Sequence, residues 1–213
     1  MAALSILIPV EAHECSPVAI VEALAAKPNL DIELLIVPAA GAIAERPDIS
    51  SLTALDPRVK IISADATSLP TLALWNKAVA CASGHWLTLL RPDDIFEPET
   101  LQVADFAKAG LGAADAIGWN ALQISPLAVP GKASSVAIPT KYDIVEFDKT
   151  ELLKSFFLWE GAGHLPKVPF GLYHGIISRE LAESVAQTIA VSGREHALAQ
   201  WEWTARVVLM GEK

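Results

Sequence analysis

Short apolar runs separated by helix-forming segments organise the first half of the chain. Almost entirely apolar runs of strand length cover residues 4–10 (LSILIPV), 32–37 (IELLIV), 59–62 and 85–90. Helical periodicity covers residues 18–27 and 70–82. Near-continuous apolar runs are typical of strands buried on both faces of a parallel sheet. Strands that alternate with helices predict an α/β fold with a doubly wound, mostly parallel central sheet flanked by helices, a Rossmann-like three-layer sandwich.

The second half of the chain has a less regular pattern. We expect helices over residues 97–108, 149–158, 179–190 and 195–210, and strands over residues 116–125, 136–139 and 172–177. The segment 39–57 is small and polar and predicts a loop with a short helical turn. Because the chain has 213 residues and contains no convincing linker, we expect one domain over residues 1–213.

Composition and charge restrict the classes of partner. The chain is 52% hydrophobic, yet no apolar run approaches the roughly 20 residues of a membrane helix, and the start lacks the basic region of a signal peptide. We therefore expect a cytoplasmic protein without a transmembrane segment. Its high content of apolar residues is compatible with a surface that contacts a second copy of the chain, in a homo-oligomer, or a protein partner. The net charge is −9, with 16 basic and 25 acidic residues and no basic cluster, which argues against nucleic-acid binding.

Two adjacent aspartates, Asp93 and Asp94, follow the predicted strand 85–90. In open α/β sheets, ligands bind outside the carboxyl ends of the strands, where these side chains would lie. Adjacent carboxylates repel each other unless a cation or a hydrogen-bond donor offsets their charge. They also suit a simpler role as capping residues for the helix that begins near Pro98.

The order of these motifs resembles the family 2 glycosyltransferases of the GT-A fold. The similar positions are Ile8-Pro9 at the end of the first strand, Arg58-Val59-Lys60-Ile61-Ile62, Asn76-Lys77-Ala78 followed by Ala82-Ser83-Gly84, and Trp86 to Asp94 in the place of the D-x-D-D motif. The resemblance covers residues 4 to 102 and is weaker beyond them.

This resemblance implies transfer of a sugar from a nucleoside-diphosphate sugar to a hydroxyl acceptor that the sequence does not identify. Residues 1–102 would form the nucleotide-sugar-binding half and residues 103–213 the acceptor-side half. A divalent cation, Mg²⁺ or Mn²⁺, would be held by Asp93 and Asp94 and would offset the charge of the diphosphate. Glu195 or Glu202 would take the proton of the acceptor hydroxyl. The residues expected to contact the donor are Pro9, Val10, Glu11, Val37, Asn76, Arg91 and Asp93.

The chain also departs from the family pattern. Val37-Pro38-Ala39-Ala40-Gly41 stands where the family has its first acidic pair, and Arg91 replaces the first aspartate of the D-x-D. The family's catalytic acid would fall near Ala199 or Gln200. Arg91 could pair with the neighbouring aspartates or contact a phosphate directly.

Two functions follow from this mixture of matches and departures. The first is an active, cation-dependent glycosyltransferase, and the second is a catalytically degenerate GT-A-like domain that serves as a binding or assembly module. A nucleotidyltransferase is a weaker third reading, because it would need a glycine-rich, basic loop where this chain has Glu11-Ala12-His13-Glu14.

Overall fold

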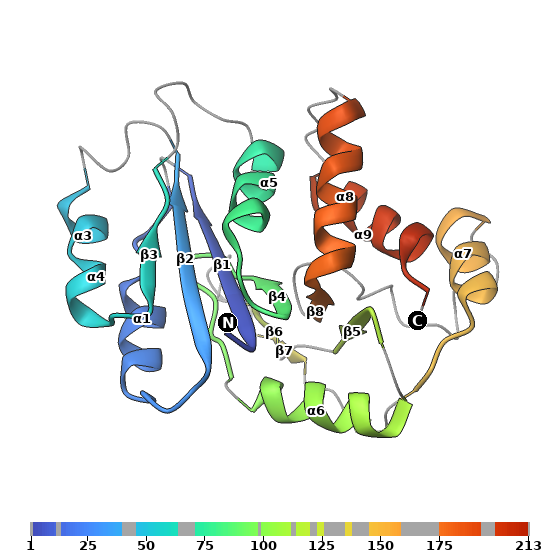
Figure 1. Ribbon diagram of the computed structural model, residues 1–213, viewed down its shortest axis with the longest axis horizontal. Helices are drawn as coiled ribbons and strands as arrows, with labels where there is room; N and C mark the ends of the chain where they lie inside the picture. The colour runs from blue at the N-terminus through green and yellow to red at the C-terminus, as the bar shows by residue number, and fades with distance from the viewer. Residues whose placement is uncertain are drawn as a thin grey trace.

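The computed structural model describes most of the chain and shows an α/β arrangement (Figure 1). The described residues are 2–11, 14–39, 46–63, 71–97, 99–111, 114–119, 123–125, 135–137, 145–158, 175–192 and 199–212. The strands are β1 (Leu4–Val10), β2 (Ile32–Pro38), β3 (Val59–Ile61), β4 (Trp86–Leu89), β5 (Ala116–Gly118), β6 (Gln123–Ser125), β7 (Ser135–Ala137) and β8 (Gly175–Ser178). The helices are α1 (Val18–Ala25), α3 (Pro47–Ser50), α4 (Leu52–Leu55), α5 (Thr71–Cys81), α6 (Thr100–Leu111), α7 (Lys149–Leu158), α8 (Arg179–Ser192) and α9 (Ala199–Met210).

The central sheet has six strands in the order β3-β2-β1-β4-β8-β5. Strands β1 to β4 are mutually parallel, whereas β8 runs antiparallel to both β4 and β5. All residues of β1 and β2 are buried, which explains why both strands read as apolar runs. The predicted mostly parallel, doubly wound sheet is therefore confirmed, with an antiparallel extension supplied by the second half of the chain.

Helices cover both faces of the sheet and divide the core into two apolar clusters. One cluster packs β1 and β2 side chains such as Ile6 and Ile36 against α1, α4 and α6. The other packs Leu7, Leu35 and Leu87 against α5, α8 and α9. Figure 1 shows α1, α3 and α4 on one side of β1 to β3, and α5 and α8 on the other. No helix among the described residues is long and apolar enough to span a membrane.

The structure corrects one element prediction and gives the bounds of another. The strand predicted over residues 116–125 is two strands in two different sheets, because β5 pairs with β8 and β6 pairs with β7. The segment 39–57, predicted as a loop with a short helical turn, contains two four-residue helices, α3 and α4. Apolar burial of Ile49 and Leu52 against α1 and β3 holds these short helices in place.

A buried carboxylate connects three strands at the amino ends of the parallel strands. Glu33 in β2 accepts hydrogen bonds from Ser5 Oγ (2.5 Å), Lys60 Nζ (2.7 Å) and the backbone nitrogen of Ser83 (2.6 Å). Burial opposes its charged form, but the hydrogen bonds from Lys60, Ser5 and Ser83 outweigh burial and lower the pKa of Glu33 from 4.5 to about 2. The charged carboxylate therefore stabilises this edge of the sheet.

The lowered pKa of Glu33 predicts a loss of stability in acid. Because the folded-state value lies below the unfolded one, the stabilisation is complete above pH 4.5 and is lost as the pH falls toward 2. We expect the free energy of unfolding to fall by about 3 kcal/mol across this window through Glu33 alone. Urea unfolding at several pH values should show a shallower decline in Glu33→Gln than in the original chain, and an unchanged slope would contradict this assignment.

Candidate functional site

The sheet has a topological switch point between β1 and β4. From β1 the chain passes through α1 to β2 on one side, whereas β4 lies on the other side of β1 and is reached through α5. The two connecting helices cover opposite faces of the sheet. Consequently the loops after β1 and β4 leave the same edge in adjacent positions. Such a point is where doubly wound folds bind their ligands.

Backbone contacts fix the start of these loops. Leu90 N donates to Leu7 O at 2.9 Å, so the chain after β4 leaves the sheet beside β1. Ala39 N donates to Val10 O at 2.8 Å and ties the ends of β1 and β2 together. The edge is thus built from the segments that follow Val10, Pro38 and Leu89.

Residues Arg91 to Asp94 form a tight turn at this edge. Asp94 N donates to Arg91 O at 3.1 Å, and Arg91 N donates to Asp94 Oδ2 at 2.8 Å. The Arg91 guanidinium donates to Asp94 Oδ1 from Nη2 at 3.3 Å and from Nε at 3.4 Å, and Nε lies 3.8 Å from Asp93 Oδ1. The side chains of Arg91 and Asp93 are 59% and 65% exposed, against 19% for Asp94. Asp94 therefore closes the turn, while Arg91 and Asp93 face solvent.

This turn does not fit the divalent-cation site predicted for Asp93 and Asp94. The Asp94 carboxylate is engaged by the backbone and the guanidinium of Arg91, and Asp93 lies near the same positive charge. Within the part of the chain that the structure describes, no three His, Cys, Asp or Glu side chains gather in a way that could hold a metal ion. The arrangement agrees instead with the alternative that Arg91 pairs with the aspartates.

The other residues predicted to contact a donor lie in the core, in the loop after β1 and between two helices. Pro9 is buried, and Val10 and Val37 are fully buried in the apolar clusters, so their side chains belong to the core. The backbone nitrogen of Glu11 donates to Glu14 Oε2 at 2.8 Å. Asn76 Nδ2 donates to the backbone oxygen of Ala186 at 3.4 Å, which places this amide between α5 and α8.

Glu195 and Glu202 are the two candidate bases. Glu195 lies outside the described residues. Glu202 lies in the first turn of α9, and its Oε1 accepts hydrogen bonds from Arg206 Nη2 at 2.7 Å and Nε at 3.0 Å. Its neighbour Trp203 is fully buried in the cluster on the α5 and α8 face, whereas the segment after Asp94 packs on the α1 face. The helix α9 therefore packs on the opposite face of the sheet from the segment that follows Asp94.

Sequence reasoning missed Arg46, which joins two loops of the same edge. Its Nη1 donates to Glu14 O at 2.8 Å, and its Nη2 lies 3.0 Å from Asp48 Oδ2. The hydrogen bond from Arg46 lowers the pKa of Asp48 to about 2. The Arg-Pro-Asp sequence indicates a helix start, but no local signal connects Arg46 with Glu14, which lies far away in the sequence.

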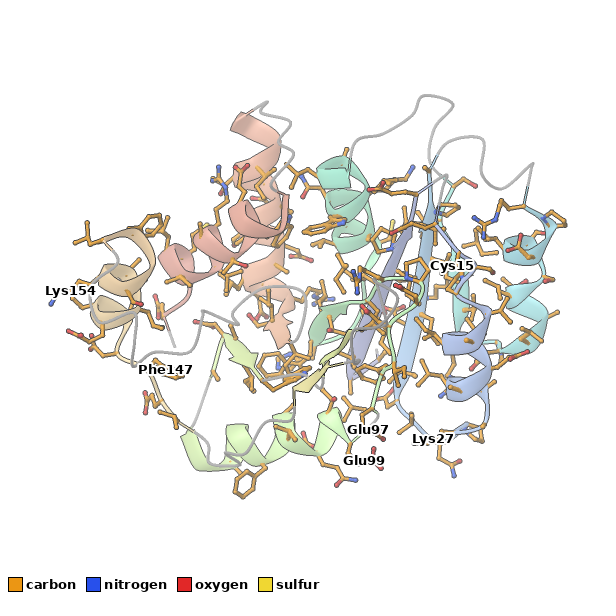
Figure 2. The ribbon with its side chains drawn as sticks, turned by 180° about the vertical axis from the view of Figure 1, so that it is seen from behind. Cys15, Lys27, Glu97, Glu99, Phe147 and Lys154 are labelled. Carbon is orange, nitrogen blue, oxygen red and sulfur yellow. The ribbon has the colours of Figure 1, made fainter. Side chains whose placement is uncertain are left out.

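A shallow pocket of about 130 Å³ lies beside the turn, between α1 and the segment Pro92–Phe96. In Figure 2, Lys27, just past the end of α1, lies beside Glu97, the residue that follows this segment, and the two side chains approach to 3.6 Å. The volume is below the roughly 300–1,000 Å³ typical of sites for drug-sized ligands. This pocket therefore does not match the size of a nucleotide-sugar site.

Comparisons with known proteins show the fold. No protein-family model and no curated protein sequence matches the chain. Among solved structures, S. aureus TarS 1–349 matches with a TM-score of 0.64 and 16% identity, covering 100% of this chain and 57% of that one. TarS 1–349 in complex with UDP-GlcNAc gives the same TM-score and identity with 55% of that chain covered, and TarS gives a TM-score of 0.63 and 15% identity with 34% covered. The chain thus spans little more than half of TarS 1–349. The chain therefore shares the α/β fold of TarS.

Proposed function

We propose that this chain binds a nucleoside-diphosphate sugar at the edge formed by the segments after β1, β2 and β4. The observation that carries the proposal is the switch point between β1 and β4, where the Glu11 and Arg91 segments leave the sheet side by side. The shared fold supports the choice of ligand, because TarS was solved in complex with UDP-GlcNAc and with UDP. We place the donor in residues 1–102 and the acceptor against residues 103–213.

The reaction we propose is transfer of the sugar to a hydroxyl acceptor. The acceptor oxygen attacks the anomeric carbon, and the bond between that carbon and the diphosphate oxygen breaks with its electron pair leaving on the diphosphate. The acceptor proton passes to a carboxylate, for which Glu202 and Glu195 are the candidates. Positive charge near the departing phosphates lowers the barrier to their release.

A second function is favoured by the surroundings of two candidate residues. Glu202 is already hydrogen bonded to Arg206, and the end of β2 presents Val37-Pro38-Ala39 in place of carboxylates. A domain with these features could bind a nucleotide or a partner protein without transferring a sugar. The two functions differ in whether a bound donor is cleaved.

Nucleoside diphosphates are expected to stabilise the folded chain. Ligand at a hundredfold excess over its dissociation constant contributes about 2.7 kcal/mol, which corresponds to a rise of about 5–10 °C in melting temperature for a chain of this size. Thermal unfolding with UDP, GDP and UDP-GlcNAc, followed by calorimetric titration, would measure the effect. UMP serves as the matched control, because it lacks the second phosphate and should stabilise less.

The outcomes separate the two functions. Saturable binding of a nucleoside diphosphate together with release of UDP from UDP-GlcNAc supports a transferase. Binding without cleavage in the presence of simple hydroxyl acceptors favours the binding module. If neither UDP nor GDP shifts the melting temperature at millimolar concentration, the donor site proposed at this edge is wrong.

A further inference from the structure

We propose that the guanidinium of Arg91 takes the place of a divalent cation at this edge, so that nucleoside-diphosphate binding by the chain does not require a metal ion. This inference rests on the proposed function, since it concerns how the same site meets the phosphates. The observation that supports it is the Arg91–Asp94 turn, in which the Asp94 carboxylate accepts hydrogen bonds from the backbone nitrogen and the guanidinium of Arg91.

The position of Arg91 matches the place where a phosphate-binding charge is needed. Arg91 comes directly after Leu90, whose backbone is hydrogen bonded to Leu7 of β1 at the switch point. Its side chain is 59% exposed, so a ligand above the strand ends can reach it. The Asp94 carboxylate accepts two hydrogen bonds from Arg91, one from its backbone nitrogen at 2.8 Å and one from its guanidinium at 3.3 Å.

The same contacts work against a metal ion. A dication bound by Asp93 and Asp94 would lie next to the guanidinium that already pairs with both carboxylates. Moving Asp94 onto the ion would also give up the hydrogen bond from Arg91 N that closes the turn. Among the described residues, no third acidic, histidine or cysteine side chain gathers there to compensate. The positive charge in this turn is therefore that of the Arg91 guanidinium.

The chemistry of arginine suits the task. A guanidinium is permanently charged and presents its donors in a planar fork that matches phosphate oxygens. The side-chain bonds to Asp94 are long, at 3.3 and 3.4 Å, so phosphate oxygens can compete for the same donors. Asp94 would remain fixed by the backbone of Arg91 while the guanidinium turns toward the diphosphate.

Calorimetric titration of UDP and GDP in EDTA and in Mn²⁺ tests the proposal on the full chain. The original chain should bind with the same affinity in both conditions, within about threefold. Arg91→Ala should weaken binding in EDTA by about tenfold to hundredfold, the contribution of a charge-assisted hydrogen bond. Lys154→Ala is the control, because it removes an equal charge from α7, where the side chain is 44% exposed and remote from the strand ends (Figure 2). Its affinity should not change.

A second variant tests whether a divalent metal ion can replace the Arg91 guanidinium. Arg91→Asp restores an acidic residue at the first position of the motif and releases Asp94 from the guanidinium. Binding by this variant should be lost in EDTA and regained with Mn²⁺. Circular dichroism and the melting temperature confirm that each variant is folded before titration.

The results distinguish this inference from the function on which it rests. If the original chain binds UDP or GDP only with Mn²⁺, or if Arg91→Ala binds as tightly as the original chain in EDTA, the role given to Arg91 is wrong and the donor site stands. If the original chain binds neither nucleotide in either condition, the proposed function fails and this inference fails with it.

Discussion

Replacing Gly84 by alanine is expected to lower the free energy of unfolding by about 3 kcal/mol, the upper part of the range for overpacking a well-filled core. A methyl group at this position would lie 2.5 Å from the backbone nitrogen of Ser5, 2.6 Å from its Oγ and 2.8 Å from the backbone carbon of Leu4. These atoms belong to β1, a central strand that is buried along its whole length and cannot move aside. The turn between α5 and β4 would therefore have to shift instead.

That shift would also disturb the Glu33 network. Gly84 N donates to Ser5 Oγ at 2.8 Å, and the preceding residue, Ser83, donates to Glu33 from its backbone nitrogen at 2.6 Å. For a chain of this length, a loss of about 3 kcal/mol corresponds to a fall of about 6–12 °C in melting temperature, which calorimetry would measure.

Gly211→Ala is the matched control for Gly84→Ala. Its new methyl group would meet Val207 O at 3.0 Å and the Leu181 side chain at 3.4 Å, so smaller adjustments are enough. We expect a change below about 1 kcal/mol, since alanine also restricts the unfolded chain. Equal effects of the two substitutions would show that the close approach of Gly84 to β1 is not what limits this position.

The sheet and its helices could be predicted from the sequence because they depend on local patterns. The apolar runs at β1 and β2 and the alternation of strands with helices determine a doubly wound sheet. The break between β5 and β6 could not be predicted, because each strand is defined by its partner, β8 or β7, and pairing is a long-range property.

The location of the candidate site could be predicted from the sequence, but the interactions of its side chains could not. The strand-end position of Asp93 and Asp94 follows from the pattern, and the structure confirms that they lie after β4 at the carboxyl edge. Whether Arg91 pairs with the aspartates or leaves them available depends on side-chain geometry within a turn, which the sequence left open. The role of Arg46 depends on a contact with Glu14 in another loop, so it could not be seen locally.

The two edges of the parallel strands are built for different tasks. At the amino edge, Glu33 and Gly84 make short, mostly buried contacts that hold β1, β2 and the α5–β4 turn together. At the carboxyl edge, Arg91 and Asp93 are largely exposed and their mutual contact is long. Substitutions at the amino edge should therefore change stability most, whereas substitutions of Arg91 should change ligand binding with little effect on folding.

Arg58 at the amino edge should show the second large effect on stability. Its Nη2 donates to Leu24 O at 2.6 Å and its Nη1 to Lys27 O at 3.0 Å. The guanidinium thus forms hydrogen bonds with carbonyl groups at and just after the end of α1. The same guanidinium forms a 2.7 Å ion pair with Asp56, whose side chain is only 2% exposed. The hydrogen bond from Arg58 lowers the pKa of Asp56, as expected for a carboxylate that is charged in the folded state.

Arg58→Ala is expected to cost about 3–5 kcal/mol, the usual effect of leaving a buried charge without its partner. Asp56 would keep the 2.8 Å hydrogen bond from the backbone nitrogen of residue 58 but would lose the guanidinium. Arg58→Lys should recover only part of the loss, because an ammonium group cannot serve the carboxylate and the α1 carbonyls with a planar fork. Urea unfolding of each variant would measure these differences. Asp56→Ala combined with Arg58→Ala should cost clearly less than the sum of the single changes, and simple additivity would show that the pair does not act as a unit.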